Sequence, residues 1–178
     1  MSGRHLSNSV GVKVMNIDQL NETESIENEA VVVRTMREGD LEAVVNIDAL
    51  SSGRRRPQYF KLMFDRTVKQ ATMQISLVAE LDGRAAGFVI GSLFYGEYGI
   101  LEPTASIDVI GVTPEVRRQG VGASLMRQLR LHLGALGVTV IRTEVEWSDI
   151  DLLSFLKRER FSLAARLCLE HRIDPTNV

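Results

Sequence analysis

The chain of 178 residues is 44% hydrophobic and 25% charged, and its formal net charge is −2. This length and composition predict a single globular domain that needs neither disulfides nor metal for its stability. The balanced charge disfavours a nucleic-acid partner, and no apolar run approaches the roughly 18 residues of a membrane helix. Cys168 is the one cysteine, so it forms no internal disulfide and fits a reducing compartment, by default the cytoplasm.

The chain divides into a polar N-terminal arm, residues 1–30, and an expected domain, residues 31–178. The arm is rich in Ser, Asn and Glu, lacks the apolar core of a secretory signal, and begins with residues that could be left over from cloning. A short apolar run within it could dock on the domain or on a second subunit. We favour a frayed arm.

The first part of the domain predicts a strand followed by two helices. Residues 30–36 are β-branched and indicate the strand, and Asp40 stands where it can cap a helix over residues 41–51. After the break "GRRRP", Pro57 starts a second helix over residues 57–71. Its apolar residues are expected along one side: Tyr59, Phe60, Met63, Phe64 and Val68.

The rest of the domain predicts a hairpin and two strand–helix units. Asp82-Gly83 separates two apolar runs within residues 75–94, which is typical of an antiparallel hairpin. The remaining elements are a strand over residues 104–112, a helix from the glycine pair onward, a strand over 137–147, a helix over 149–160 and a closing strand over 161–173, where apolar residues alternate. The predicted order is βααβββαβαβ, an α/β fold with a mixed, mostly antiparallel sheet flanked by helices.

The turn before the long helix has the composition of an anion site. Main-chain N–H groups from Arg118 through Ala123 lie at the expected helix start, where donors lack intrahelical acceptors and the helix dipole is positive. Gly120 and Gly122 have no Cβ, so a phosphate oxygen can approach the main chain. No lysine follows Gly122, which excludes a P-loop, and Leu125 replaces the third glycine of a dinucleotide motif. A plain glycine-flanked helix cap remains the alternative.

With its flanks, the turn "IGVTPEVRRQGVGASLM" resembles the central motif of the GCN5-related N-acetyltransferases, the GNAT family, which is Arg/Gln-x-x-Gly-x-Gly/Ala after a strand ending in V-x-P-x-x-R. The predicted element order follows that family from residue 31 to residue 173. The resemblance implies the acyl-CoA N-acyltransferase fold, whose sheet splays between strands four and five to bind acetyl-CoA as co-substrate. The strand end would pair with the pantetheine arm, and the turn would hold the pyrophosphate. The implied cofactor-binding residues are Ile110, Gly111, Val112, Arg117, Arg118, Gln119, Gly120, Val121, Gly122, Ala123 and Asp149.

The stretch "TEVEWSD" carries the catalytic prediction. It resembles "LEVRxSN" of the ribosomal-protein N-acetyltransferase branch, the branch closest in motif, and this places Glu144 as the general base for the acceptor ammonium. A solvated carboxylate at a strand end is the alternative interpretation of Glu144. Glu146, Asp108 and Glu97 are substitute bases.

Three positions depart from the family pattern. The usual Asn at the start of the last helix is Asp149, which can still cap that helix or contact the pantetheine arm. The usual Tyr is Leu156, which has no proton to give to the leaving thiolate. Arg160 replaces the usual Gly before the closing segment. The departures question the catalytic power of the chain but not its binding of acetyl-CoA.

The resemblance implies transfer of acetyl from acetyl-CoA to a primary amine of a protein, at a lysine or an N-terminus, or of a small molecule. A non-catalytic acyl-CoA-binding module or sensor is the alternative. We expect no membrane partner and no metal, because His5, His132 and His171 share no ligand spacing. A homodimer is possible. The arginines at 54–56 could attract an acidic acceptor or simply be solvated.

Overall fold

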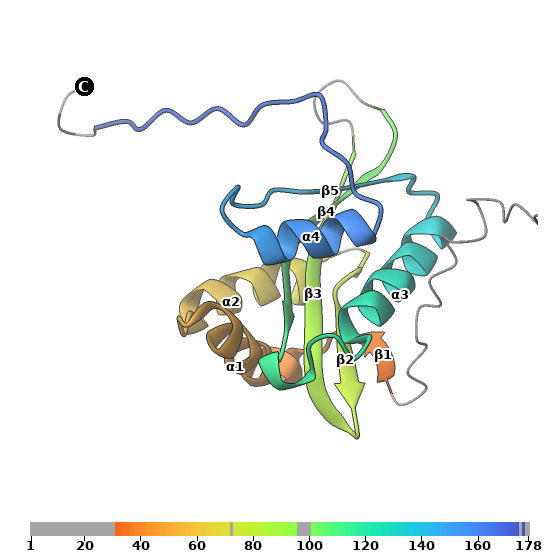
Figure 1. The fold of residues 1–178 in the computed structure, drawn as a ribbon. Coiled ribbons are helices and arrows are strands. Elements are labelled where there is room, and N and C mark those ends of the chain that lie inside the picture. Colours follow the sequence, from red (N-terminus) through yellow and green to blue (C-terminus); the bar gives the residue numbers. More distant parts are fainter. Residues whose placement is uncertain (1–30, 72, 96–100, 175, 177–178) are drawn as a thin grey trace, which may run out of the picture.

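The computed structural model describes residues 31–71, 73–95, 101–174 and 176, so the predicted N-terminal arm lies outside the described residues. Figure 1 shows a sheet with helices on both of its faces. The strands and helices are β1 (Val31–Thr35), α1 (Leu41–Ser52), α2 (Pro57–Phe64), β2 (Leu77–Leu81), β3 (Arg84–Phe94), β4 (Thr104–Val112), α3 (Val121–Ala135), β5 (Val140–Thr143) and α4 (Ile150–Arg158). The short turns η2 (Glu38–Asp40), η3 (Asp65–Lys69) and η5 (Pro114–Val116) lie between them.

The strand order in the sheet is β1-β2-β3-β4-β5, and neighbours are antiparallel except for β4 and β5, which are parallel. The predicted α/β class and mostly antiparallel sheet are confirmed.

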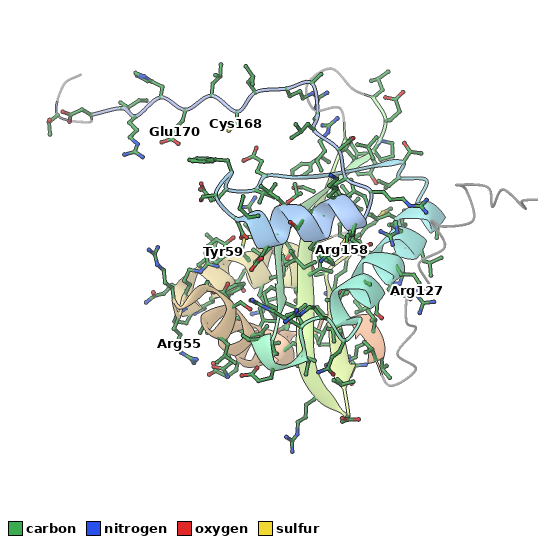
Figure 2. All side chains as sticks on the ribbon, viewed as in Figure 1. Arg55, Tyr59, Arg127, Arg158, Cys168 and Glu170 are labelled. Carbon is green, nitrogen blue, oxygen red and sulfur yellow. The ribbon has the colours of Figure 1, made fainter. Side chains whose placement is uncertain are left out.

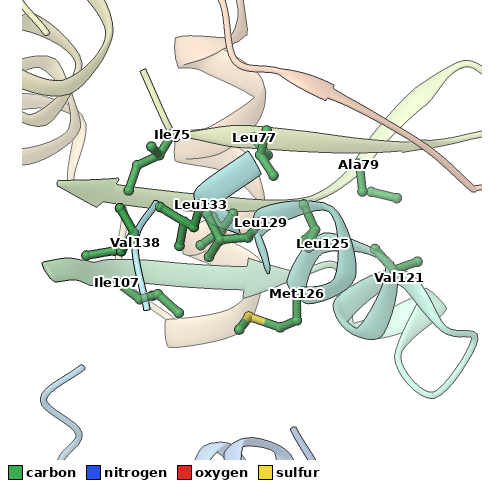
Figure 3. Packing of buried hydrophobic residues seen from close by; sticks show 13 residues of the cluster. Ile75, Leu77, Ala79, Ile107, Val121, Leu125, Met126, Leu129, Leu133 and Val138 are labelled. Atoms are coloured by element: carbon green, nitrogen blue, oxygen red, sulfur yellow. The ribbon is translucent and has the colours of Figure 1, made fainter. Parts of the chain in front are cut away.

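Two hydrophobic clusters fill the spaces between the sheet and its helices. On one face, Leu125 and Leu129 of α3 pack against strand residues such as Leu77, as Figure 3 shows. On the opposite face, Phe60 of α2 meets Phe88 of β3 edge to face, with ring centroids 5.8 Å apart. Both faces of the sheet are therefore covered.

The β2–β3 hairpin has the tight turn that its sequence predicts. Asp82 and Gly83 have positive φ angles of 52° and 72°, as a type I′ turn requires. Leu81 pairs with Arg84 directly across the turn. The next strand, β4, spans Thr104–Val112, which are the bounds predicted for it. Short-range turn chemistry therefore predicted this part of the sheet correctly.

Asp40 precedes α1 as predicted, but its carboxylate does not cap that helix. It accepts a hydrogen bond from the main-chain N–H of Arg37 (2.7 Å) and two from the Arg34 guanidinium (both 2.8 Å). Asp40 already has helical φ and ψ angles of −82° and −9°, so it lacks the extended backbone of a capping residue. The Arg34 guanidinium holds the pKa of Asp40 below its usual range, so this ion pair joins β1 to the start of α1.

Two predicted elements are shorter in the structure. The second helix gives way to a π turn, where the Thr67 hydroxyl donates to the Met63 carbonyl (2.8 Å) and competes with the regular helix hydrogen bonds. β5 covers only part of the predicted residues 137–147, because its pairing with β4 is confined to Val140–Thr143. Leu136, the residue after the last turn of α3, is 39% exposed.

The predicted closing strand over residues 161–173 is wrong. The described sheet ends at β5, and residues 162–173, which we call the C-terminal arm, pair with no described strand. Leu163 and Leu167 of the arm are 99% and 88% exposed. Alternating apolar residues predict an extended chain with one apolar face, but a strand also needs a partner edge, and the arm does not reach one in its own subunit. In Figure 1 the arm leaves α4 and runs clear of the domain.

Candidate active site

The site begins where β4 and β5 separate. Their parallel pairing ends at Ile107 and Thr143, while β4 continues to Val112. The Thr143 hydroxyl donates to the Ile107 carbonyl (3.0 Å), which fixes the point of separation. The splay expected between the fourth and fifth strands is therefore present in the strand register.

Main-chain groups of β4 beyond that point alternate in direction. The N–H of Thr113 donates to the carbonyl of Ala86 in β3 (2.9 Å), which sets which β4 residues turn their main-chain groups toward β3. In an antiparallel pair the hydrogen-bonded positions alternate, so Gly111 also faces β3, while Ile110 and Val112 turn their N–H and C=O groups away from it. Two of the three predicted strand residues thus present their main chain to the splay.

Gly111 has a different reason to be glycine. A Cβ on Gly111 would lie 2.7 Å from Cε1 of Phe88, a contact that the buried ring cannot accept without shifting. Val112 has a further partner, because the Ser51 hydroxyl at the end of α1 donates to its carbonyl (3.0 Å). A carbonyl oxygen has two lone pairs, so Val112 can still accept a second hydrogen bond.

The start of α3 is an uncapped helix N-terminus. Gly120 precedes the helix with a φ of +84° and offers no side chain to the first amides. The first intrahelical bond runs from Ser124 N to Gly120 O (2.9 Å), so the amides of residues 121–123 have no intrahelical acceptor. Arg118, with a φ of +63°, is exposed in the same turn. This terminus combines amide donors, a positive dipole end and a cation, which suits an anion.

Arg117 is likewise exposed in this turn, whereas Gln119 is engaged within it. The Gln119 main-chain N–H donates to the Val116 carbonyl (3.3 Å), and its side-chain amide donates to the Glu115 carbonyl (3.3 Å). The prediction of uninterrupted amide donors from Arg118 onward is therefore wrong at Gln119, because this turn closes on itself there.

Gly122 joins α3 to α4. A Cβ on Gly122 would lie 3.1 and 3.2 Å from two ring carbons of Phe155, and 3.8 Å from Cγ2 of Val112. The same residue therefore lies beside the end of β4 and beneath α4. Close packing of Phe155 is a second physical reason for glycine here, beside the approach of a phosphate.

α4 starts and ends as its sequence suggests. The Asp149 carboxylate accepts from Leu152 N (3.0 Å), so the predicted cap is confirmed. Leu156, at the place of the usual tyrosine, is 5% exposed. Arg160 takes the left-handed conformation expected of the usual glycine, with a φ of +66°, while Phe161 N bonds to Leu156 O (2.9 Å) across the helix end.

Two carboxylates follow directly after the last β4–β5 pair. Glu144 is the residue after Thr143, and Asp108 is the residue after Ile107. The β3 register skips Asp108 at a bulge, and Ser92 donates its hydroxyl to the Asp108 carboxylate (2.6 Å). Both carboxylates are exposed, and they stand at corresponding positions on the two separating strands.

The other substitute bases are placed less directly. Glu146 lies in the turn before α4, where its carbonyl accepts from Asp149 N (2.9 Å) and its side chain is exposed. Glu97 lies outside the described residues.

The exposure of Tyr59 on α2 is a feature that the sequence did not predict. This residue was expected on the buried side of α2, but it is 38% exposed, because adjacent residues such as Tyr59 and Phe60 cannot share one helix face. Burial raises the pKa of the Tyr59 phenol, the charge of Arg56 opposes this rise, and the charges of Asp108 and Asp48 add to it. Figure 2 labels Tyr59 on α2 in the view of Figure 1.

The loop arginines are tied to α1. Arg56 forms an ion pair with the buried Asp48 (2.6 Å), and its guanidinium lies 4.9 Å from the Tyr59 ring centroid. Arg55 pairs with Glu42, so these two arginines hold the loop in place and carry partners already. This favours a structural interpretation of the "GRRRP" loop.

Among the described residues, no three His, Cys, Asp or Glu side chains gather as a metal site. None of the described helices combines the length and apolar character needed to cross a bilayer.

The family model of the acetyltransferase (GNAT) family matches residues 41–159. An L-2,4-diaminobutyric acid acetyltransferase of Nocardia farcinica is 36% identical over 70 residues, 39% of this chain, and the match spans about a third (34%) of that relative's length. The ribosomal-protein-S18-alanine N-acetyltransferase from Escherichia coli has the same fold, with a TM-score of 0.63 at 21% identity over 75% of this chain and 79% of that one. The structure of an aminoglycoside N-acetyltransferase in complex with CoA is similar as well, with a TM-score of 0.68 at 18% identity over 80% of this chain and 94% of that one. The glycine turn and the splay lie within the matched residues, and the chain belongs to the acetyltransferase (GNAT) family.

Proposed function

We propose that this chain transfers the acetyl group of acetyl-CoA to a primary amine by direct attack of the amine on the thioester. One observation carries the proposal: the unpaired end of β4 and the uncapped start of α3 meet at one place. The Cβ position of Gly122 lies 3.8 Å from Val112 Cγ2, so the amides of both elements serve one site. Family membership supports the same activity.

The chain's own groups suit acetyl-CoA chemically. The amides of a pantetheine arm can pair with the main chain of Ile110 and Val112, as an added strand does. A pyrophosphate can accept from the amides of residues 121–123, where the helix dipole is positive. Arg117 and Arg118 add positive charge to the same turn. Bound acetyl-CoA supplies the activated acyl group, and the chain supplies its orientation.

The transfer needs a group that takes a proton from the acceptor ammonium. We assign this role to Glu144, because it borders the splay and Asp108 already accepts a hydrogen bond from Ser92. The neutral amine then forms a C–N bond to the acyl carbon while the C–S bond breaks. As the C–S bond breaks, the attacking nitrogen loses its second proton to water, and the leaving thiolate takes one proton from water, since Leu156 has none to give. Glu144 releases the proton of the ammonium to water. The thiolate is a fair leaving group near neutral pH because a free thiol has a pKa of about 8.5.

The acceptor that we favour is the amine of a protein or peptide. Trp147 is 84% exposed and follows Glu144 by three residues in the sequence, so it offers an apolar surface that a peptide chain can cover. The stretch "TEVEWSD" also resembles the ribosomal-protein branch. The names of the relatives include small amine-bearing acceptors as well, so a small molecule is the second class to test.

The test is release of free thiol from acetyl-CoA across a panel of amines. The panel contains peptides with a free N-terminus, lysine peptides blocked at the N-terminus, diaminobutyrate and an aminoglycoside. We expect thiol release that depends on the amine, and an acetylated product by mass spectrometry. Tight CoA binding without release would support the sensor alternative, and absence of binding would contradict both.

We also propose that the protein works in the cytoplasm as a homodimer. Support for a reducing compartment comes from Cys168, which is exposed and carries no disulfide. Support for a dimer comes from the exposed leucines of the C-terminal arm, since soluble monomers seldom expose contiguous apolar surface. Cell fractionation tests the first proposal and light scattering after gel filtration tests the second.

A further inference from the structure

We propose that Ser51, in the last turn of α1, is a positioning residue for the pantetheine arm of acetyl-CoA. Its hydroxyl donates to the Val112 carbonyl (3.0 Å), and so it holds the end of the β4 edge with which the arm would pair. The inference rests on the proposed function and deepens it, because it concerns how that edge is prepared to receive CoA.

The peptide group between Val112 and Thr113 is held from two sides. Its N–H, which belongs to Thr113, donates to the Ala86 carbonyl of β3 (2.9 Å), and its C=O, which belongs to Val112, accepts from Ser51. In Figure 1, α1 lies beside the end of β4 that leads into η5. The orientation of this peptide group therefore depends on a helix as well as on the neighbouring strand.

Ser51 belongs to a well-defined helix end. Gly53 ends α1 with a φ of +71°, and its N–H donates to the Ala49 carbonyl (2.9 Å). Ser51 is half-buried, whereas the adjacent Ser52 is exposed. The Ser52 hydroxyl donates to the Arg54 carbonyl (3.3 Å) and accepts from the Arg54 N–H (3.2 Å). Of these two neighbouring serines, Ser51 is therefore the one that links α1 to β4.

A second hydroxyl supplies the carbonyl at the other end of the same edge. Thr143 donates to the Ile107 carbonyl (3.0 Å) at the last β4–β5 pair. Between the two carbonyls lie the outward-facing N–H and C=O of Ile110 and the N–H of Val112. These groups can pair with the amides of the arm, while the carbonyls at both ends receive a donor from the protein itself. The two hydroxyls thus mark the limits of the open edge.

The hydroxyl of Ser51 gains importance when the arm covers the edge. A bound arm excludes water, and a carbonyl that loses its donor in a dry site is costly. Ser51 supplies a donor in the free protein already, so the Val112 carbonyl is oriented before CoA arrives. Loss of a hydrogen bond of this kind is expected to weaken CoA binding about three- to tenfold. The phosphates meet a different element, the start of α3, so their binding should not depend on Ser51.

The first test compares CoA with 3′,5′-ADP, which carries phosphates but no pantetheine arm. Calorimetry on Ser51→Ala should show CoA affinity reduced about three- to tenfold and 3′,5′-ADP affinity within about twofold of native. Ser52→Ala is the matched control and should leave both affinities within about twofold of native. Unchanged CoA affinity in Ser51→Ala, or equal losses for the two ligands, would overturn the proposal.

The second test separates the hydroxyl from the space that it fills. Threonine and valine have nearly the same shape, so Ser51→Thr should bind CoA more tightly than Ser51→Val, and circular dichroism checks that both are folded. Equal CoA affinities of the two variants would overturn the proposal. The thiol-release assay is separate from these titrations. Absence of thiol release, in a protein whose Ser51→Ala variant loses affinity for CoA but not for 3′,5′-ADP, would refute acetyl transfer alone.

Discussion

The two walls of the splay, one formed by β4 and α3 and the other by β5 and α4, present different kinds of chemical group. The β4–α3 wall consists of main-chain groups: strand edges at Ile110 and Val112 and helix amides that follow Gly120. On the β5–α4 wall the chemistry depends on side chains: Glu144 follows β5 and is exposed, whereas Leu156 of α4 is buried. Most substitutions leave the main-chain N–H and C=O groups in place, whereas a single substitution removes a side chain. The acetyl-CoA side of the site therefore depends on main-chain geometry, whereas the acceptor side depends on individual side chains.

The largest expected effect is on the side-chain wall. Glu144→Gln should lower kcat by roughly 100-fold or more while leaving CoA affinity unchanged, because the amide cannot take the ammonium proton. Glu146→Gln is the matched control and should stay near the native kcat. Initial rates at saturating acetyl-CoA and calorimetric titration of CoA measure the two quantities. If Asp108→Asn loses more activity than Glu144→Gln, the general base is Asp108 of β4 and not Glu144.

The next effect is on the main-chain wall. Gly122→Val should weaken CoA binding at least tenfold, about 1.4 kcal/mol, because a branched side chain would crowd both the helix amides and the Phe155 ring, 3.1 Å from the Cβ position. Gly134→Val in the same helix meets nothing within 4 Å and should bind CoA normally. Calorimetry measures the CoA affinity of both folded variants, and equal affinities would contradict a specific role of Gly122 in CoA binding.

A smaller effect is expected where the family's tyrosine is missing. Leu156→Tyr should change kcat by less than about tenfold in either direction, since a weakly basic thiolate gains little from an acid. The phenol also enters a space where the leucine is 5% exposed, which should cost about 1 to 3 kcal/mol of stability. The checks are kcat at saturating acetyl-CoA and thermal unfolding. A native protein without turnover, beside an active Tyr variant, would favour the acyl-CoA sensor.

The smallest effect concerns the end of α4. Arg160 has a φ of +66°, so Arg160→Gly should raise the free energy of unfolding by about 0.5 to 1 kcal/mol through relief of the left-handed strain. Arg158→Gly, within the helix, should lower it by about 1 kcal/mol. Urea denaturation of both variants measures the contrast. Destabilisation by Arg160→Gly would mean that the arginine side chain makes an interaction worth more than the strain.

The sequence predicts well those features that depend on residues close together in the chain. The Asp82-Gly83 turn, the bounds of β4 and the start of α3 at Val121 follow from residues that are close in sequence, and the structure agrees with each. The closing strand failed because alternation in residues 161–173 specifies a face but not a partner. The sequence did not predict that Gly122 also makes room for the Phe155 ring, because Phe155 contacts this position only through the tertiary packing of α4.

The central claim is that acetyl-CoA pairs with the edge of β4, and residue-resolved amide exchange tests it most directly. The amides of Val109 and Gly111 face β3 and should be protected with or without acetyl-CoA, whereas those of Ile110 and Val112 face the splay. We predict that saturating acetyl-CoA slows exchange at one or both of Ile110 and Val112 and at residues 121–123, while Gly83 in the distant hairpin is unaffected. Unchanged exchange at all of these β4 and α3 amides, in a protein that calorimetry shows to be saturated, would contradict the account.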